Sequence, residues 1–243
     1  MRISLPNILY AAAHPLRALR YLRHRDHISY EQIAGFLPED PVILEAGAHD
    51  GTNTVEMARF WPKASIHAFE PVPAASDYVI NRLAEFYPRV MCHPVGLGPY
   101  DGEIQMHISG EGSYGDCQSS SMLSPSLNQL QEFPDVRFER TITVPVTTLD
   151  SWANREGIGR VDFLWLDMQG YELHALAGAT RVMSDVHAVH MEVSNVQLYA
   201  GAPLYPEVVR RMASFGFRPV VEAIFRRGGN VLFVRRDERR RST

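Results

Sequence analysis

The stretch "LEAGAHDGTNT", residues 44–54, contains two glycines, Gly47 and Gly51, and three polar side chains that do not belong in a core, those of Glu45, His49 and Asp50. The run before it is apolar and largely β-branched, and the run after it has the spacing of a helix. A strand that ends in a glycine turn and continues as a helix presents free N–H groups to a ligand. Glu45, His49 and Asp50 add polar side chains at the same place. The stretch therefore predicts a loop that binds a nucleotide or a related cofactor.

The glycine spacing separates three classes of ligand for this loop. A dinucleotide-binding turn has the pattern G-x-G-x-x-G, whereas Gly47 and Gly51 are spaced as G-x-x-x-G. A P-loop needs a lysine after its last glycine, and Thr52 stands there instead. S-adenosylmethionine carries an ammonium group and ribose hydroxyls, and Glu45 and Asp50 can accept hydrogen bonds from the ammonium group or from ordered water. The loop therefore favours S-adenosylmethionine over NAD and ATP.

A further acid follows the next predicted strand. Residues 65–71 read "SIHAFEP", which places Glu70 at the end of that strand. A carboxylate there can accept hydrogen bonds from both hydroxyls of a ribose. NAD-binding folds use the same device, so Glu70 alone indicates a ribose and does not distinguish the two cofactors.

Three side chains farther along the sequence could carry the chemistry. Asp167 ends the apolar run that begins at residue 162, and we expect it across a crevice from Gly47. There it could take a proton from a hydroxyl acceptor. His190 and Glu192 alternate along one strand and point to the same side of it. We expect both at the strand's carboxyl end, with His190 the more suitable general base because its charge changes near neutral pH.

Apolar runs alternate with helical periodicity from residue 42 onward. Strands are predicted at 42–48, 65–71, 90–98, 162–169 and 188–194, and helices at 52–60, 75–87, 171–178 and 204–214. A hairpin around "RRGGN" closes the chain. Continuous apolar strands imply burial on both faces, so we expect an α/β fold with a mostly parallel sheet, helices on both faces and an antiparallel C-terminal hairpin.

The stretches "ILEAGAHDGTNT", "FEPVP", "TLDSW", "DFLWLDMQGYELHALAGA" and "HMEVS" together resemble the FkbM family of S-adenosylmethionine-dependent methyltransferases. The resemblance covers roughly residues 42–236. It implies a Rossmann-like class I methyltransferase fold with a seven-stranded sheet. It also implies O-methylation of a sugar hydroxyl in a surface glycan, a glycolipid or a natural product.

The resemblance and the residues together define a predicted site. The predicted cofactor contacts are Glu45, Gly47, Ala48, His49, Asp50, Gly51, Thr54, Glu70, Pro71 and Asp167. The predicted catalytic residues are Asp167, His190 and Glu192, and the predicted substrate contacts are Glu172, Ser120 and Ser121. Glu172 begins a helix, where the helix dipole explains an acid almost as well as substrate binding does. The candidate ligands for a divalent cation are scattered, so no metal is predicted.

The sequence predicts one main domain with an insertion and an extension at each end. Between residues 99 and 150 the pattern changes to short polar strands and a Ser-rich loop, which we expect to form a lid or substrate wall. We predict an N-terminal helical extension at 1–40, a methyltransferase domain at 41–237 and a basic tail at 238–243.

The composition of the chain limits the classes of partner that it could bind and the cellular compartment in which it could work. A net charge of −4 argues against a nucleic-acid partner and leaves a small molecule or a glycan as the acceptor. Two cysteines without metal-ligand spacing predict reduced thiols in a cytoplasmic protein, and no apolar run is long enough to predict a membrane span. Residues 14–27 combine leucines on one helical face with arginines, which fits packing on the domain or peripheral contact with the inner membrane face. The oligomeric state stays open.

Two alternatives come from other functional classes. The first is a nicotinamide-dependent oxidoreductase, which the glycine spacing disfavours. The second is a non-catalytic cofactor-binding subunit of another enzyme, in which the acids at 167 and 192 could be replaced without consequence.

Overall fold

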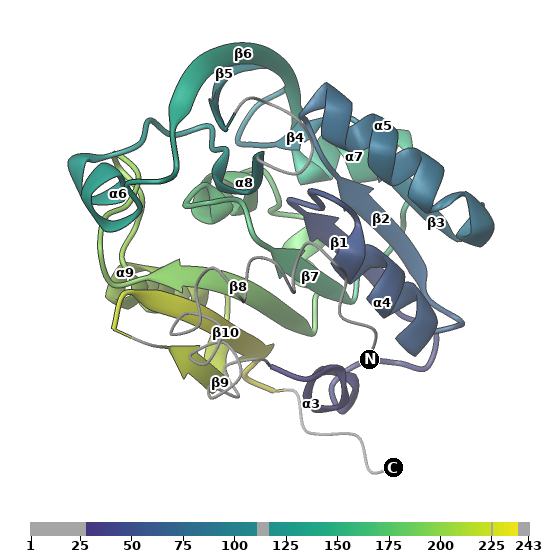
Figure 1. Ribbon diagram of the computed structural model, residues 1–243. Coiled ribbons are helices and arrows are strands. Elements are labelled where there is room, and N and C mark those ends of the chain that lie inside the picture. Colours follow the sequence, from purple (N-terminus) through teal and green to yellow (C-terminus); the bar gives the residue numbers. More distant parts are fainter. Residues whose placement is uncertain (1–27, 111–116, 225, 238–243) are drawn as a thin grey trace, which may run out of the picture.

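The computed structural model describes residues 28–110, 117–224 and 226–237, and its centre is a twisted sheet (Figure 1). Within this part of the chain the main sheet has seven strands in the order β3-β2-β1-β7-β8-β10-β9. Its parallel strands are β1 (Val42–Ala46), β2 (Ser65–Phe69), β3 (Val90–His93), β7 (Phe163–Leu166) and β8 (Ala188–Ser194). The antiparallel strands are β9 (Phe217–Ile224) and β10 (Gly228–Arg235). The predicted seven-stranded, mostly parallel sheet with its C-terminal hairpin is confirmed.

Helices cover both faces of this sheet. One face carries α3 (Tyr30–Ala34), α4 (Thr52–Phe60) and α5 (Pro73–Arg82), and the other carries α7 (Leu149–Arg155), α8 (Glu172–Ala177) and α9 (Tyr205–Ser214). Successive strand residues alternate between the two sides, so Ile43 is buried with the first set and Leu44 with the second. Burial on both faces explains why these strands read as continuous apolar runs.

Short 3₁₀ turns join several of these elements. They are η1 (Ala84–Phe86), η2 (Cys117–Ser119) and η3 (Val182–Ser184). The helix predicted at 75–87 is α5 followed by η1, and α5 begins earlier because a proline fits the first helical position.

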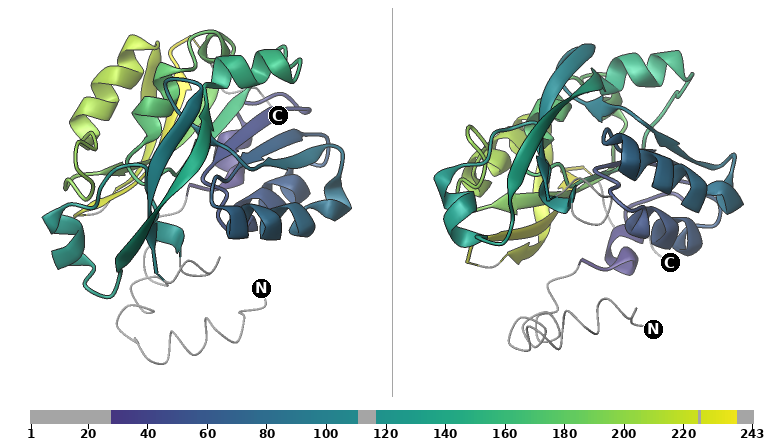
Figure 2. Two further views of the ribbon diagram at one scale, coloured as in Figure 1. Left: turned by 90° about the horizontal axis from the view of Figure 1, so that it is seen from above. Right: turned by 45° about the horizontal axis from the view of Figure 1, so that its top comes forward.

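A second sheet lies over the carboxyl ends of the central strands. It consists of β4 (Gly96–Leu97), β5 (Gly102–Ser109) and β6 (Phe138–Thr147) in the order β4-β6-β5, with β5 and β6 antiparallel. Seen from above, the long β5–β6 pair crosses over the main sheet (Figure 2). The helix α6 (Leu127–Glu132) lies in the segment between β5 and β6.

The prediction of a single strand over 90–98 is wrong. Pro94 has no N–H to extend the ladder, and the Val95 N–H donates to the His93 carbonyl at 2.8 Å in a turn. The chain therefore leaves the main sheet after His93 and joins the second sheet at Gly96. The strands β5 and β6 are also longer than the short strands expected between residues 99 and 150.

A small separate core attaches the second sheet to the domain. Met106, Ile108 and Val144 from this sheet pack with Val72 and Ala75, near the start of α5. The second sheet is thereby held close to the loops that follow β1 and β2. The helix expected at 14–27 and the tail at 238–243 lie outside the described residues. In the part of the chain that the structure describes, each helix is too short or too polar to cross a membrane.

Candidate active site

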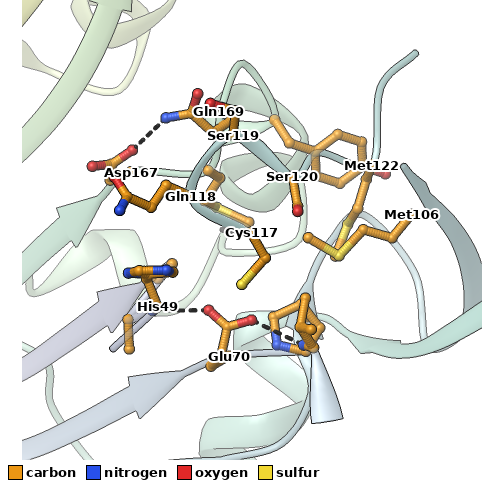
Figure 3. Close-up of a pocket in the computed structure, with 18 of the residues that line it drawn as sticks. His49, Glu70, Met106, Cys117, Gln118, Ser119, Ser120, Met122, Asp167 and Gln169 are labelled. Atoms are coloured by element: carbon orange, nitrogen blue, oxygen red, sulfur yellow. Dashed lines mark hydrogen bonds between the residues drawn. The ribbon is translucent and has the colours of Figure 1, made fainter. Parts of the chain in front are cut away.

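A cavity of about 670 Å³ lies where β1, β2 and β7 end, below the second sheet (Figure 3). Its walls come from the loops after these strands and from the insertion. The lining includes Gly47, Ala48, His49, Asp50, Glu70, Pro71, Met106, Cys117, Ser120, Met122, Asp167 and Glu192. Residues that are far apart in the sequence thus face one cavity.

Gly47 allows the ends of β1 and β7 to meet. It has a φ of +89°, and a Cβ at this position would lie 1.9 Å from the carbonyl oxygen of Asp167. The Asp167 N–H in turn donates to the Ala46 carbonyl at 3.0 Å. A side chain at residue 47 would force these two strand ends apart, so the glycine sets the distance between the loop and Asp167.

Glu70 stands beside the same loop, as the sequence predicted. Its Oε2 accepts from the His49 N–H at 2.8 Å and its Oε1 from the Val72 N–H at 2.9 Å (Figure 3). Each oxygen keeps a lone pair that can accept from a ligand. Burial raises the pKa of Glu70 to about 7, and the two backbone donors oppose that shift. The carboxyl group is therefore oriented before any ligand arrives.

His49 and Asp50 complete the loop in different ways. His49 has a φ of +51°, and its buried Nε2 has no hydrogen-bond partner among the described residues. The Asp50 carboxylate accepts from the Thr52 N–H at 2.9 Å and from the Thr52 hydroxyl at 2.8 Å, and it lies 3.3 Å from Arg82. Burial would raise the pKa of Asp50, but these hydrogen bonds and the Arg82 charge outweigh it and lower the pKa. Asp50 fixes the shape of the loop, whereas His49 offers an unused ring nitrogen.

Three of the predicted cofactor contacts lie behind the loop. Thr54 donates its hydroxyl proton to Glu45, and neither residue lines the cavity. Burial raises the pKa of Glu45 to about 8, which favours the neutral form of this carboxyl group. Gly51 has a φ of +71°, caps the start of α4 and also lies outside the cavity lining. These residues support the turn from behind.

The cavity also holds two acids joined by an amide. The Nε2 of Gln169 donates to Asp167 Oδ1 at 2.9 Å and to Glu192 Oε2 at 2.8 Å. Burial, and then the charge of Asp167, raise the pKa of Glu192 well above its ordinary value. Both effects favour the neutral form of the Glu192 carboxyl group.

The structure places the predicted substrate contacts in three different settings. Glu172 accepts from the Met168 N–H at 2.8 Å and from the Gly170 N–H at 3.2 Å, which ties it to the loop before α8. Burial raises its pKa to about 7. Ser120 lines the cavity and accepts from the Ser109 N–H at 3.0 Å. Ser121 does not line it.

His190 lies away from the cavity, and its expected place at the carboxyl end of β8 is wrong. It is the third residue of this strand, and its ring stacks on Trp165 with a centroid distance of 3.7 Å. Alternation gives the face on which a side chain lies but not its depth along the strand, and two residues span about 6.6 Å. Among the predicted catalytic residues, the structure brings together Asp167 and Glu192 and leaves His190 out.

Sequence reasoning did not identify Gln169 and Tyr199. Gln169 has a φ of +54°, which is unusual for a residue other than glycine. The Tyr199 hydroxyl lies 2.7 Å from the Ser119 carbonyl and 3.1 Å from Gln169 Oε1. Only the position of Gln169 between Asp167 and Gly170 could have drawn attention to it. Over the described residues, no group of three or more His, Cys, Asp or Glu side chains is arranged to hold a metal ion.

Comparison with known proteins shows the family to which this chain belongs. The sequence model described as "Methyltransferase FkbM domain" matches residues 45–219. The chain belongs to the FkbM methyltransferase family. A relative named "2-O-methyltransferase NoeI", from Sinorhizobium fredii, is 30% identical over 174 residues that cover 71% of each chain. "Methyltransferase sdnD" of Sordaria araneosa is 27% identical over 206 residues, which cover 77% of this chain and 73% of that one.

Solved structures of similar shape are distant in sequence from this FkbM methyltransferase. Fibrillarin of Aeropyrum pernix, solved with S-adenosyl-L-methionine natively bound, is 13% identical with a TM-score of 0.45. That match covers 84% of this chain and 74% of the other.

The residues of this FkbM methyltransferase fit its cofactor, S-adenosylmethionine. Gly47 has no side chain that would occupy the space between the ends of β1 and β7. The Glu70 carboxyl oxygens are oriented by backbone donors and can still accept hydrogen bonds, and His49 Nε2 has no partner among the described residues and is free to bind a ligand. With membership of a methyltransferase family shown, the alternative of a nicotinamide-dependent oxidoreductase is wrong.

Proposed function

We propose that this FkbM methyltransferase methylates a hydroxyl oxygen of a sugar in a surface glycan, a glycolipid or a natural product. The observation that carries the proposal is the Asp167–Glu192 pair, which lies in the cavity beside the cofactor loop and presents two carboxyl groups, both bound by the Gln169 amide, to a hydroxyl group. The name of the relative NoeI, a 2-O-methyltransferase, supports oxygen as the methylated atom.

The chemistry defines what these side chains would do. S-adenosylmethionine supplies an electrophilic methyl group. A hydroxyl acceptor must be aligned with that group and must lose its proton as the new bond to oxygen forms. In our proposal Asp167 accepts this proton. Glu192 holds the acceptor by a hydrogen bond.

A second cavity offers room for the rest of the acceptor. It has a volume of about 260 Å³ and shares Phe133, Gln169, Glu192 and Leu198 with the first cavity. Most of its other lining is aromatic or small and apolar, with Tyr199, Ala202 and Pro203 among it. Arg227, also in the lining, forms an ion pair with Glu132. Apolar walls with few hydrogen-bonding groups suit a sugar ring, which has apolar faces and a polar edge.

Mass spectrometry of surface glycans and small glycosides from a deletion strain tests this proposal. We expect one species to lack a CH₂ increment, and we expect purified protein with methyl-labelled S-adenosylmethionine to restore it. Failure to restore any methyl group would contradict the proposal and favour the non-catalytic subunit. Restoration by the Asp167→Asn variant at the wild-type rate would contradict the role of the acid pair.

We further propose that the enzyme works in the cytoplasm on a small-molecule or glycan acceptor, without a nucleic-acid partner. The net charge of −4 supports the exclusion of nucleic acid. No disulfide joins Cys92 and Cys117, which agrees with a reducing compartment. Peripheral contact with the inner membrane face through residues 14–27 stays a prediction.

A further inference from the structure

The helix α6 has the opposite polarity to an ordinary surface helix. Such helices bury their apolar residues and expose their polar ones. In α6 the side chain of Gln129 is 2% exposed, whereas Leu127 is 76% and Leu130 is 46% exposed. Packing alone would favour the reverse orientation, because that would bury two leucines and leave the amide in water. Burial of apolar surface therefore does not determine how this helix faces.

Contacts at both ends of α6 hold it in this orientation. The N-cap residue Ser126 donates its N–H to the Leu198 carbonyl at 2.9 Å and its hydroxyl proton to the Gln197 carbonyl at 2.6 Å. At the other end, Glu132 forms an ion pair with Arg227, in the turn between β9 and β10. These contacts join the helix to the loop after β8 and to the C-terminal hairpin, so the surrounding fold directs its amide inward.

The side-chain amide of Gln129 has no partner within the described part of the chain. Gln129 lines the first cavity, and neither its amide oxygen nor its amide nitrogen forms a hydrogen bond with a described residue. Its backbone N–H, in contrast, donates to the Ser126 hydroxyl at 3.3 Å as part of the helix cap. A buried amide without a partner is unfavourable. Its donor and acceptor ends are therefore available to a ligand that enters the cavity.

Gln129 lies on the side of the cavity where we expect the acceptor. Phe133 follows it by one helical turn, and the Phe133 N–H donates to the Gln129 carbonyl at 3.0 Å. Phe133 lines both cavities, and so do Leu198, to which the start of α6 is bonded, and the acid Glu192. In Figure 1, α6 lies on the side of β8 and α9, whereas β2 and α5 lie on the other side. The amide is thus placed beside the boundary that the two cavities share.

The Phe133 ring adds an apolar surface next to this amide. The guanidinium group of Arg227 lies over the ring, 5.7 Å from its centroid, in a cation–π contact that holds the ring in place. A glutamine amide carries an acceptor and a donor in one plane, so it can bind two neighbouring hydroxyl groups at once. An aromatic ring one helical turn away can pack against the apolar face of the same sugar. The two side chains together match a sugar ring.

We propose that Gln129 is a specificity-determining residue that binds two neighbouring hydroxyl groups of the acceptor sugar, while the Phe133 ring packs against the sugar's apolar face. This role rests on the proposed function, because it requires a sugar as the acceptor. It also narrows the class of substrate. The acceptor is a sugar ring with two adjacent free hydroxyl groups in addition to the one that is methylated.

Transfer of a labelled methyl group to a defined set of acceptors tests this role. The probes are the methyl glycosides of glucose, galactose, mannose, fucose and rhamnose, together with glycans from a deletion strain. For a probe that the wild type methylates, we expect Gln129→Met, which keeps the length and removes the amide, to raise KM roughly tenfold and to leave kcat within about threefold. The affinity for S-adenosylhomocysteine should not change. Gln131→Met, an exposed glutamine of the same helix, is the matched control and should keep the wild-type KM.

Deoxy analogues of the methylated probe identify the hydroxyl groups that the amide binds. In the wild type, we expect a raised KM for two analogues, which lack adjacent hydroxyl groups. In Gln129→Met the same two analogues should have the KM of the parent probe, because the partner of these hydroxyl groups is already gone. Equal losses in the variant and the wild type would overturn the proposal.

Thermal unfolding separates ligand binding from a structural role. Because the amide is unpaired in the free protein, we expect Gln129→Met to leave the Tm unchanged or to raise it. Gln129→Leu should behave in the same way, and it replaces Gln129→Met in the kinetics if methionine does not fit. A Tm lowered in both variants would mean that the amide supports the fold, which would contradict the proposal.

The results also distinguish failure of this role from failure of the proposed function. If the wild type methylates none of the glycosides or glycans, the proposed function fails and the role of Gln129 fails with it. If the wild type methylates a probe and Gln129→Met keeps the wild-type KM, only the role of Gln129 fails. A loss of affinity for S-adenosylhomocysteine in Gln129→Met would assign the amide to the cofactor and overturn the proposal.

Discussion

At the scale of single residues, Glu70 gives the most direct test of cofactor recognition. Its two oxygens are each held by one backbone donor and remain able to accept from ribose hydroxyls. We expect Glu70→Ala to weaken binding of S-adenosylhomocysteine by tenfold or more, since it removes up to two hydrogen bonds to the ribose, each of which contributes about 0.5–1.5 kcal/mol. Titration calorimetry measures this, with the exposed Glu103→Ala as the control. Equal affinity in the two variants would remove the ribose role from Glu70.

Asp167 should affect turnover and not binding. Asp167→Asn keeps the size of the side chain and removes the charge that accepts a proton, so we expect kcat to fall about a hundredfold or more with cofactor affinity little changed. Measurement of labelled methyl transfer together with calorimetry separates the two effects. Full activity in this variant would place the chemistry elsewhere in the cavity.

At the scale of elements, the contact between β1 and β7 depends on Gly47. A methyl group there would meet the Asp167 carbonyl oxygen at 1.9 Å, so Gly47→Ala must separate the strand ends. We expect the free energy of unfolding to fall by about 3 kcal/mol and cofactor binding to be lost. Gly157→Ala is a matched control, since Gly157 also has a positive φ, of +68°, but has nothing within 4 Å of the added carbon. It should lose only about 1–2 kcal/mol, and similar losses in both variants would contradict the argument.

Sequence patterns predicted these strands better than the elements that close the site. Buried parallel strands are continuous apolar runs, and each ends where a polar or glycine residue must face a ligand, which identified Gly47, Glu70 and Asp167. The second sheet was harder to predict because its long strands have polar outer faces and include Pro145, features that also occur in loops. The sequence around Tyr199 gave no signal, because its hydroxyl contacts Gln169 and Ser119, which are 30 and 80 positions away along the chain.

At the scale of the whole molecule, buried acids should make stability depend on pH. Burial raises the pKa of Glu45 to about 8 and those of Glu70 and Glu172 to about 7. A folded-state pKa above the unfolded value contributes stability at low pH that is lost as the pH rises through the folded pKa. Burial lowers the pKa of His67 and His93 to about 4, so the histidines oppose this trend mainly below about pH 6.5, where the unfolded chain takes up their protons.

As the pH rises from 6.5 to 8 the unfolded chain loses the remaining protons of these histidines, and the acids increasingly determine the slope. We therefore expect the free energy of unfolding, measured by denaturant titration without cofactor, to fall by about 1 kcal/mol per pH unit or more over this interval. Glu45→Gln should reduce the slope, because its amide oxygen can still accept from Thr54 but no longer titrates. A wild-type stability that stays flat or rises over this interval would mean that the three acids are already ionised in the folded protein. Glu70 would then meet the ribose as a charged carboxylate at every physiological pH.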